Sequence, residues 1–307
     1  MNNILIATDK PFAPVAVQGI KEIAEKGGCQ LSLLEKYTDK SQLLAAVKDA
    51  NAIIIRSDII DKEVLAAAPN LKIVVRAGAG YDNVDLDAAT QHGVVVMNTP
   101  GQNANAVAEL AFGLMLMLAR AGFSGKAGTE LRSKTLGIHA YGNIGKLVNK
   151  IAQGFGMKVY AYDPFVDKFV IEADGITPVG SADELYEKSQ YVSLHLPANS
   201  ATKNSINLAL LSKMPKGAAL INTARKEVID EAGLLKAFEN RPDFMYASDI
   251  EPACKAEIEE RFKGRCFLTP KKMGAQTEEA NINAGLAAAN QIVKFFQTGD
   301  KTFQVNK

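Results

Sequence analysis

Short apolar runs recur along the chain and alternate with segments of helical periodicity. The runs are rich in Ile, Val and Leu, and they are apolar at successive positions rather than at every second one. Such strands between helices are typical of a parallel sheet that is covered on both faces. In the first hundred residues the pattern predicts strands at 3–7, 31–34, 52–56, 71–75 and 94–97. Residues 1 to 98 are therefore predicted to form a five-stranded α/β unit.

The same alternation resumes near residue 100 and predicts a second α/β unit. It begins with a long apolar helix, about 103–120, which either connects two domains or forms a subunit contact. Further strands are predicted at 136–139, 158–162, 191–196, 218–222, 245–249 and 266–268, and a last helix at about 277–297 precedes a polar tail. The pattern predicts an α/β fold with two doubly wound parallel sheets.

The segment from Leu136 to Asp163 has the order strand, glycine turn, helix, strand and acidic residue. This order is that of a dinucleotide-binding βαβ unit, in which a pyrophosphate meets backbone N–H groups at a helix N-terminus. The usual G-x-G-x-x-G reads A-Y-G-N-I-G here, so the alternative of an ordinary βαβ crossover stays open. The predicted cofactor contacts come from Tyr141, Gly142, Asn143, Ile144 and Gly145.

Asp163 ends the second strand of this segment, 18 residues after Gly145. An acidic residue in that place accepts hydrogen bonds from the adenosine ribose. Its charge would repel a 2′-phosphate, so the sequence predicts NAD rather than NADP as the cofactor.

Composition narrows the class of protein. The net charge of +1 over 307 residues provides no global basic field for nucleic acid or an anionic membrane. No apolar run approaches the length of a membrane span. The cysteines Cys29, Cys254 and Cys266 are widely spaced and form no zinc pattern, which is typical of a reduced, cytoplasmic protein. We expect neither nucleic acid, membrane nor metal as a partner.

Motifs in both halves of the chain resemble those of the D-2-hydroxyacid dehydrogenase family. In the first half they are Ile55-Arg56-Ser57, Arg76 to Asp85, Met97 to Asn103 and Val107 to Leu110. In the second half they are the glycine turn, Ser193 to Pro197, Asn222 to Arg225, Asp249 to Pro252 and Thr269-Pro270. The motifs are long, follow one another in the family's order and span nearly the whole chain.

The resemblance implies two interleaved domains with the active site in the cleft between them. A flavodoxin-like substrate domain would comprise residues 1–98 and 275–307, and a Rossmann NAD domain would comprise 99–274. The chain ends soon after the last predicted helix, so we expect no C-terminal regulatory domain. The family also suggests a homodimer.

The resemblance further implies roles for individual residues. Arg225 would bind the substrate carboxylate and the reacting oxygen, and Glu251 would tune the acid/base residue. Substrate contacts are expected from Arg56, Ser57, Ala77, Gly78, Ala79, Gly80 and Asn103, with Arg56 and Ser57 at a distal phosphate and the glycine segment at the carboxylate. Cofactor contacts are expected from His195, Leu196, Pro197, Thr223, Ala224 and Asp249, the last at the nicotinamide carboxamide.

Each of these roles has a plainer alternative. Arg225 could equally form a surface salt bridge. Gly78 and Gly80 could simply form a tight turn, and Asp249 could bind local backbone groups. His92 is predicted at a helix end, where a cation is favourable, and His139 is predicted as a packed core residue. His195 is predicted to line the cofactor site.

The chain departs from the family at the acid/base residue, which is usually a histidine two residues before a glycine. No histidine follows His195. Counting back from Gly274 places Lys272 in that position, whereas counting forward from Pro270 places Lys271. We favour Lys272, because the following Met-Gly-Ala matches the family's turn of small residues. Such a lysine needs a lowered pKa, which burial and Arg225 would favour and Glu251 would oppose.

The resemblance therefore implies NAD-dependent oxidation of D-3-phosphoglycerate to 3-phosphohydroxypyruvate, the first step of serine biosynthesis. Reduction of glyoxylate or hydroxypyruvate, or action on another D-2-hydroxy acid, is the alternative within the enzyme class. An NAD(H)-sensing binding protein, similar to the family's transcriptional corepressors, is the alternative from another class, and loss of the histidine is the feature that suggests it.

Overall fold

The computed structural model describes residues 1–306 and contains two compact units. The first unit is Met1–Asn103 together with the chain from Gln276 onward, and the second is Ala104–Ala275. The domain boundaries predicted from the sequence lie after residues 98 and 274. In the structure the boundaries between the two units lie after residues 103 and 275.

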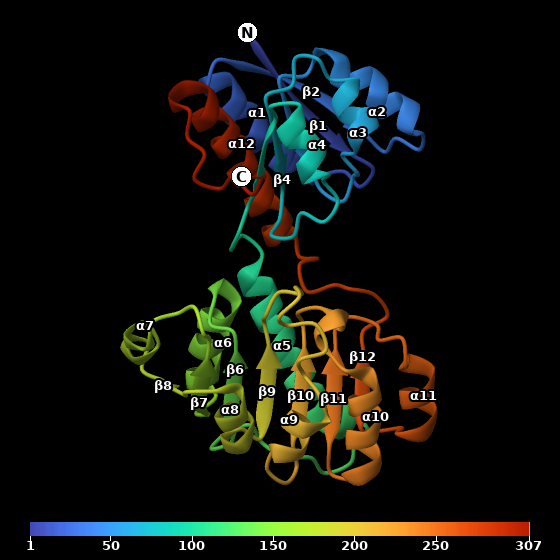
Figure 1. Cartoon of the computed structure of the whole chain (residues 1–307), viewed down its shortest axis with the longest axis vertical. Coiled ribbons are helices and arrows are strands. Elements are labelled where there is room, and N and C mark those ends of the chain that lie inside the picture. Colours follow the sequence, from blue (N-terminus) through green and yellow to red (C-terminus); the bar gives the residue numbers. More distant parts are fainter. Residues whose placement is uncertain (307) are drawn as a thin grey trace. The chain divides into compact units, whose positions relative to one another are not determined.

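The first unit is a parallel sheet between two layers of helices (Figure 1). Its strands are β1 (Asn2–Thr8), β2 (Cys29–Glu35), β3 (Ala52–Ile55), β4 (Ile73–Arg76) and β5 (Val95–Asn98). Its helices are α1 (Pro14–Lys26), α2 (Lys40–Ala46), α3 (Lys62–Ala66), α4 (Leu86–Gln91) and α12 (Glu278–Thr298). The strand order β2-β1-β3-β4-β5 is that of flavodoxin-like sheets. All neighbouring strands are parallel.

Successive residues of β1 face the two opposite layers of this unit, which explains its continuous apolar sequence. Ile4 and Ile6 pack in the core beneath α1 and α12, whereas Leu5 and Ala7 pack in the core beneath α2 and α3. The last helix of the chain thus lies beside the first one, as Figure 1 shows. Because both faces of such a strand are buried, its sequence does not alternate between apolar and polar residues.

The polar tail after α12 pairs with the edge strand β5 and is not free. The Val305 N–H donates to the Val96 carbonyl at 2.9 Å. The Asn306 side chain accepts from the Val96 N–H at 2.7 Å and donates to the Val94 carbonyl at 2.8 Å. These contacts cover an edge that would otherwise offer unpaired backbone groups to another strand.

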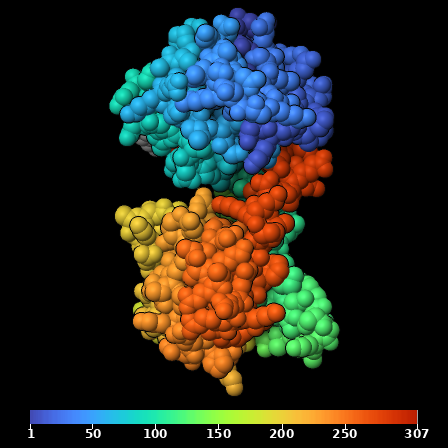
Figure 2. Space-filling model, turned by 90° about the vertical axis from the view of Figure 1, so that its right-hand side faces the viewer, coloured from blue at the N-terminus to red at the C-terminus, as the bar shows by residue number. Residues whose placement is uncertain are grey.

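The second unit is a larger parallel sheet with helices on both faces. Its strands are β6 (Thr135–His139), β7 (Lys158–Tyr162), β8 (Thr177–Pro178), β9 (Tyr191–Leu194), β10 (Ala219–Asn222), β11 (Met245–Ser248) and β12 (Cys266–Leu268). Its helices are α5 (Ala104–Ala119), α6 (Asn143–Gly154), α7 (Lys168–Ala173), α8 (Ala182–Lys188), α9 (Leu208–Lys213), α10 (Glu231–Asn240) and α11 (Lys255–Arg261). Figure 2 shows the face that α10 and α11 cover, in orange.

The strand order β12-β11-β10-β9-β6-β7-β8 reverses direction between β6 and β9. In a doubly wound sheet the crevice at such a reversal is the usual ligand site. Residues of α5 and α6 pack on one face of the sheet, and residues of α8, α9, α10 and α11 pack on the other.

The predicted fold class and strand set are confirmed by these two sheets. The sequence analysis missed β8, because two residues carry no detectable period. The strand predicted at 191–196 ends at Leu194 instead. Among residues 1–306, no helix is both long enough and apolar enough to span a membrane.

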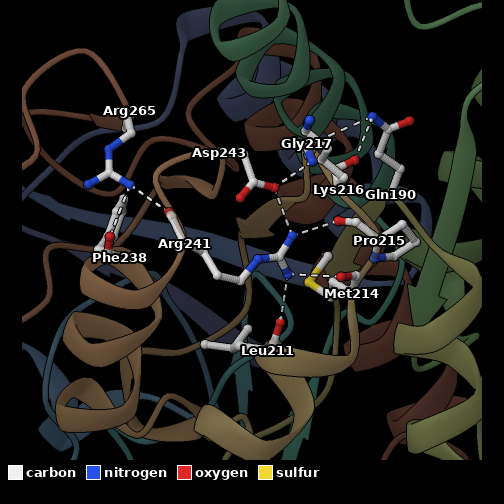
Figure 3. Close-up of polar contacts among 10 residues, drawn as sticks. All are labelled: Gln190, Leu211, Met214, Pro215, Lys216, Gly217, Phe238, Arg241, Asp243 and Arg265. Atoms are coloured by element: carbon white, nitrogen blue, oxygen red, sulfur yellow. Dashed lines mark hydrogen bonds and ion pairs between the residues drawn. The ribbon is translucent and has the colours of Figure 1, made fainter.

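Arg241 joins the end of α9 to the start of β11 (Figure 3). Its guanidinium donates to the carbonyls of Leu211, Met214 and Pro215 at 2.7–3.1 Å. It also pairs with Asp243 at 2.9 Å, and that carboxylate accepts the Gly217 N–H. Leu211 lies in the last turn of α9 and the other two residues follow the helix, so one planar cation binds three carbonyl groups at this helix end.

We expect Arg241→Ala to lower the free energy of unfolding by roughly 2–3 kcal/mol, because half-buried acceptors lose a charged donor. Urea unfolding at pH 7 measures the loss. Arg261→Ala is the matched control, since Arg261 is 42% exposed and its ion pairs with Glu239 and Glu257 lie at the surface. Its loss should stay below about 1 kcal/mol. Equal losses for both variants would show that the Arg241 contacts do not stabilise the unit.

Candidate active site

The glycine turn between β6 and α6 leaves the N-terminus of α6 uncapped. Gly142 is the N-cap residue, and no side chain caps the helix. The first N–H groups of an α-helix have no acceptor within the helix. A Cβ atom built on Gly142 would meet nothing within 4 Å, so this N-terminus is open to an approaching group. The N–H groups of Asn143, Ile144 and Gly145 begin the helix and are suited to an anion.

The first and last positions of the motif, Ala140 and Gly145, both have backbone surroundings that favour glycine. A Cβ on Gly145 would lie 2.7 Å from the Ala140 carbonyl oxygen, so only glycine lets α6 pack this closely on β6. Ala140 has a φ of +79°, a left-handed conformation that glycine adopts with less strain. The backbone at Ala140 therefore keeps the conformation of the glycine that the motif lacks.

Asp163 is held against the glycine turn by two backbone donors. Its carboxylate accepts the Tyr141 N–H and the Phe165 N–H, each at 2.8 Å. The Tyr141 side chain is fully buried, and its hydroxyl contacts Asp174 at 2.9 Å. The Tyr141 N–H is therefore engaged within the chain, and a contact of Tyr141 to a cofactor stays a prediction. The carboxylate keeps further acceptor positions for hydroxyl groups.

His139 is the last residue of β6, and His195 directly follows the neighbouring strand β9. The His195 N–H donates to the His139 carbonyl at 3.0 Å. Both ring nitrogens of His195 are buried without a partner among the described residues, and so is the Thr223 hydroxyl. Burial lowers the pKa of His139 to about 4, against the opposing charge of Asp163. Burial, with a smaller contribution from His139, lowers the pKa of His195 to about 3.

The prediction that His139 is a core residue is confirmed, since it is 8% exposed and packs near Tyr162 and Tyr186. His92 caps the end of α4, also as predicted. The uncapped helix, the open space at Gly142 and the unpartnered polar atoms of His195 and Thr223 fit a dinucleotide such as NAD. The contacts predicted for His195, Leu196, Pro197, Thr223 and Ala224 stay predictions.

Arg225 follows β10 and is available to an anion. Its guanidinium donates to the carbonyl of Ala224 at 2.9 Å, and no ion pair joins it to any residue in 1–306. Asn222, fully buried, braces this turn by accepting the Ala224 N–H and donating to the Arg225 carbonyl. The alternative of a surface salt bridge is therefore wrong for the described part of the chain.

The turn that carries both lysines is fixed by Asp249. This carboxylate accepts the Thr269 hydroxyl at 3.0 Å, the Met273 N–H at 2.8 Å and the Gly274 N–H at 2.7 Å. The alternative that Asp249 binds local backbone is confirmed, and a contact to a carboxamide stays a prediction. Lys271 and Lys272 are both exposed, so the burial that the sequence analysis invokes to lower a lysine pKa is absent.

Glu251 does not have the surroundings expected of a residue that tunes an acid/base group. Its side chain is 56% exposed, and its carboxylate lies 3.3 Å from the Lys255 ammonium. A tuning role for Glu251 stays a prediction. The neighbouring acidic residue with buried hydrogen bonds is Asp249.

In the first unit, the segment after β4 forms a turn with unused backbone donors. Gly78 has a φ of +149° and its carbonyl accepts the Thr99 N–H at 2.9 Å. The Ala77 N–H is engaged with the Ile55 carbonyl, so Ala77 supports the turn rather than offering a donor. The N–H groups of Gly78, Ala79 and Gly80 donate to no acceptor among residues 1–306. Consecutive free N–H groups form a concavity suited to an anion.

Arg56 has a structural role that the sequence did not reveal. Its guanidinium donates to the carbonyls of Lys10 and Pro11 at 3.1 and 3.3 Å and to the Asn281 side chain on α12. It also lies over the Phe12 ring at 5.3 Å. Burial lowers the pKa of Arg56, although the charges of Asp58 and Asp9 oppose this.

The sequence analysis expects only Arg56 and Ser57 at a distal phosphate, but the structure places a buried acidic residue beside them. Ser57 is exposed, but the next residue, Asp58, is 5% exposed and accepts the N–H groups of Asp9 and Arg56 and the Tyr37 hydroxyl. Sequence reasoning missed Asp58 and the amide of Asn83 that donates to its carbonyl. The one signal in the sequence was that Asn83 belongs to the motif from Arg76 to Asp85. Asn103 ends the first unit, immediately before α5.

Comparison with known proteins gives one family throughout. The family model described as "D-isomer specific 2-hydroxyacid dehydrogenase, catalytic domain" matches residues 5–306. A crystal structure described as cofactor (NAD⁺) bound 3-phosphoglycerate dehydrogenase from Entamoeba histolytica is 49% identical, with a TM-score of 0.89 over 100% of this chain and 99% of that one.

Curated relatives carry two different names. A D-3-phosphoglycerate dehydrogenase of Methanocaldococcus jannaschii is 35% identical over 92% of this chain and 56% of its own length. A hydroxypyruvate reductase of Thermotoga maritima is 34% identical over 86% of this chain and 91% of its own. The chain spans about half the length of the curated phosphoglycerate dehydrogenases that it matches.

The buried histidines make stability depend on pH in a defined window. Because the folded pKa values of His139 and His195 lie below the ordinary value of 6.5, the unfolded chain binds more protons once the pH falls below 6.5. The stability that these residues contribute is then complete above pH 6.5 and is lost progressively toward pH 4 for His139 and pH 3 for His195. Between pH 7 and pH 5.5 each histidine should cost about 1 kcal/mol.

Urea unfolding of wild type and of His139→Gln across this interval measures that slope. The variant should lose about half of the pH dependence that these two residues cause. A wild-type slope in His139→Gln would show that His139 is not held neutral in the folded state.

Proposed function

Because the chain belongs to the family of D-isomer specific 2-hydroxyacid dehydrogenases, we propose that it oxidises D-3-phosphoglycerate to 3-phosphohydroxypyruvate with NAD. This reaction is the first step of serine biosynthesis. The observation that carries the proposal is the 49% identity, over the full chain, to a protein described as an NAD⁺-bound 3-phosphoglycerate dehydrogenase.

The proposed chemistry assigns a proton transfer to this chain and a hydride transfer to the cofactor. When bound, NAD would supply the acceptor for the hydride of C2. Lys272 would take the proton of the C2 hydroxyl, so the substrate carbon would be oxidised to a ketone. Lys271 is the alternative acceptor, since both lysines belong to the turn that Asp249 holds.

The substrate carboxylate is assigned to Arg225 and to the turn at Gly78–Gly80. Arg225 offers the remaining donors of a rigid planar fork, which suits a carboxylate and the reacting oxygen. The free N–H groups of Gly78, Ala79 and Gly80 add donors that need no rearrangement. Holding the carboxylate this way orients C2, and orientation supplies a large part of such a rate.

The distal phosphate is assigned to Arg56 and Ser57. Three of the five guanidinium N–H groups of Arg56 are used by Lys10, Pro11 and Asn281, which leaves two for a ligand. Those three contacts fix the side chain, so it loses little conformational freedom when a phosphate binds. The hydroxyl of Ser57 is exposed beside it.

Asp163 supports NAD over NADP as the cofactor. Its carboxylate is held rigidly by the backbone donors of Tyr141 and Phe165, so it cannot swing away from a 2′-phosphate without losing both hydrogen bonds. We assign the ribose hydroxyls to it. Assembly as a homodimer in the cytoplasm is part of the same proposal.

Reduction of hydroxypyruvate is the second candidate, favoured by the relative from Thermotoga maritima, of which the chain covers 91%. The two candidates differ in the phosphate of the substrate. A substrate without a phosphate has no group that would accept hydrogen bonds from the remaining donors of Arg56.

Steady-state kinetics with a substrate panel tests the proposal. With NAD, kcat/KM for 3-phosphoglycerate should exceed that for D-glycerate by about 10- to 100-fold, since one charge-assisted contact is worth roughly 1.5–3 kcal/mol. NADP should be the poorer cofactor. Faster reduction of hydroxypyruvate than of 3-phosphohydroxypyruvate with NADH would favour the second candidate and contradict the first.

Variants of the two lysines test the assignment of the base. Lys272→Ala should lower kcat by roughly 10²- to 10⁴-fold, the usual contribution of a general base. NAD affinity, measured by fluorescence titration, should be unchanged, because Lys272 is assigned to the substrate. Lys271→Ala is the matched control and should be mild. The reverse order of effects would place the base at Lys271, and full activity of both variants would exclude a lysine base.

A further inference from the structure

We propose that Asn98, the last residue of β5, is a positioning residue that sets the affinity for the substrate carboxylate. The inference rests on the proposed function, because it concerns the turn at Gly78–Gly80 to which the carboxylate is assigned. Asn98 is assigned no contact to the substrate itself. It acts on the direction in which the backbone N–H groups of that turn point.

The end of β5 binds two consecutive carbonyl groups of the turn. The amide of the Asn98 side chain donates to the Ala79 carbonyl at 2.6 Å. The next residue, Thr99, donates its backbone N–H to the Gly78 carbonyl at 2.9 Å. Both carbonyl groups are therefore directed toward the end of β5.

The direction of each carbonyl group fixes the direction of the N–H group that follows it. In a planar trans peptide the carbonyl of one residue and the N–H of the next point in opposite directions. The peptide bonds of this turn are trans. The N–H groups of Ala79 and Gly80 therefore both point away from the end of β5. Two consecutive N–H groups on one side of the chain form a concavity that suits an anion.

These N–H groups are available to a ligand. Neither of them donates to an acceptor among residues 1–306. Ala79 is exposed and Gly80 is half-buried, so a solute can approach the turn. Because the turn is exposed, its two hydrogen bonds to the end of β5 are what gives it a defined shape.

Asn98 is itself held firmly enough to act as an anchor. It pairs with Arg76 in the parallel register of β4 and β5. Its carbonyl accepts the side-chain amide of Gln291, a residue of α12 that is only 9% exposed, at 3.1 Å. The amide that binds Ala79 thus extends from a strand end that is fixed by both a strand and a helix.

The charge beside the turn also favours an anion. Gly78 has a φ of +149°, and a Cβ atom built there would overlap a guanidinium nitrogen of Arg76. The Nε of the same guanidinium donates to the Arg56 carbonyl at 3.0 Å. Glycine therefore lets the turn pass directly beside a cation, which attracts a carboxylate to the N–H groups.

Asn98→Ala is the primary test. Without the amide, the Ala79 carbonyl can rotate, and the Gly80 N–H loses its fixed direction. We expect kcat/KM for 3-phosphoglycerate with NAD to fall by about 10-fold, the factor that one charge-assisted hydrogen bond accounts for. The loss should appear in KM rather than in kcat, because the carboxylate is bound alike in the ground state and the transition state. An unchanged kcat/KM would overturn the inference.

Two partial substrates separate the carboxylate from the phosphate. D-glycerate carries the carboxylate alone, and glycerol 3-phosphate carries the phosphate alone. Asn98→Ala should lower kcat/KM for D-glycerate as much as for 3-phosphoglycerate. It should leave the Ki of glycerol 3-phosphate, measured as a competitive inhibitor, at the wild-type value. A merely structural role would weaken the binding of both compounds, so equal losses for the two overturn the inference.

Arg56→Ala should give the opposite pattern, because Arg56 is assigned to the phosphate. Its Ki for glycerol 3-phosphate should rise, and its kcat/KM for D-glycerate should fall much less. Inhibition by glycerol 3-phosphate that weakens in Asn98→Ala but not in Arg56→Ala would contradict the separate roles and overturn the inference.

Asn98→Ser keeps the test valid if the alanine variant does not fold. Serine retains a polar group at the end of β5, but its side chain is one bond shorter than that of asparagine and does not reach the Ala79 carbonyl. The serine variant should show the same selective loss for D-glycerate. Wild-type kcat/KM for D-glycerate in this variant would show that the Asn98 hydrogen bond is not needed, and the inference would be wrong.

Asn51→Ala is the matched control. The Asn51 side chain also donates to a backbone carbonyl, that of Asn70 at 3.3 Å, and it accepts the Asn3 N–H at 2.8 Å. Asn51 precedes β3, at the opposite end of the parallel strands from Asn98. Its loss should lower stability and leave the kinetic constants unchanged. A loss for D-glycerate equal to that of Asn98→Ala would show that general destabilisation accounts for both, and would overturn the positioning role.

Failure of the proposed function has a different signature. A wild type that reduces hydroxypyruvate but does not oxidise 3-phosphoglycerate would show that the proposed substrate is wrong. Hydroxypyruvate carries the same carboxylate, so its kcat/KM should then fall in Asn98→Ala as predicted for D-glycerate. If the wild type is inactive with the whole panel, calorimetric titration of D-glycerate into the NAD-bound protein replaces the kinetics. An equal Kd for wild type and Asn98→Ala would overturn the inference.

Discussion

Parallel pairing of every strand is the constraint on which the rest of the structure depends. In both sheets the carboxyl ends of all strands meet at one edge, so residues far apart in the chain are brought to neighbouring loops. In the second unit this edge collects the glycine turn after β6, Asp163 after β7, His195 after β9, Arg225 after β10 and Asp249 after β11. In the first unit it collects Arg56 after β3 and the Gly78 turn after β4.

Buried polar side chains then hold these loops in place. Asn222 braces the turn before Arg225, Asp163 holds the start of the glycine turn, and Asp249 holds the lysine turn. Each of these side chains lies at the end of a strand and binds backbone groups of its loop. The loop therefore cannot move without breaking these hydrogen bonds. The side chains of Arg225 and Lys272 are thus attached to backbone that is held in place, which is what preorganised binding and proton transfer require.

The sequence predicted the fold well because the signals for it are local. Continuous apolar runs report burial on both faces of a sheet, and the glycine turn reports its own geometry even with alanine at position 140. The contacts that were missed join distant parts of the chain. Arg56 binds Asn281, 225 residues away, and Asn306 pairs with β5, 210 residues away. No period or motif in the sequence records such pairs. The role taken from family resemblance treated Arg56 only as a ligand, whereas its hydrogen bonds show that it also holds this chain together. For Asp249 the plainer alternative from the sequence, a contact to local backbone, is the one that the structure shows.

In the proposed reaction, a lysine on a turn held by Asp249 replaces the histidine usual at this position as the proton acceptor. The most direct measurement is a crystal structure of the complex with NAD and 3-phosphoglycerate. We expect the Lys272 Nζ atom within about 2.6–3.2 Å of the C2 hydroxyl oxygen, with the Asp249 hydrogen bonds to Met273 and Gly274 intact. A Lys272 side chain directed away from that hydroxyl, with Lys271 or another group in its place, would contradict it.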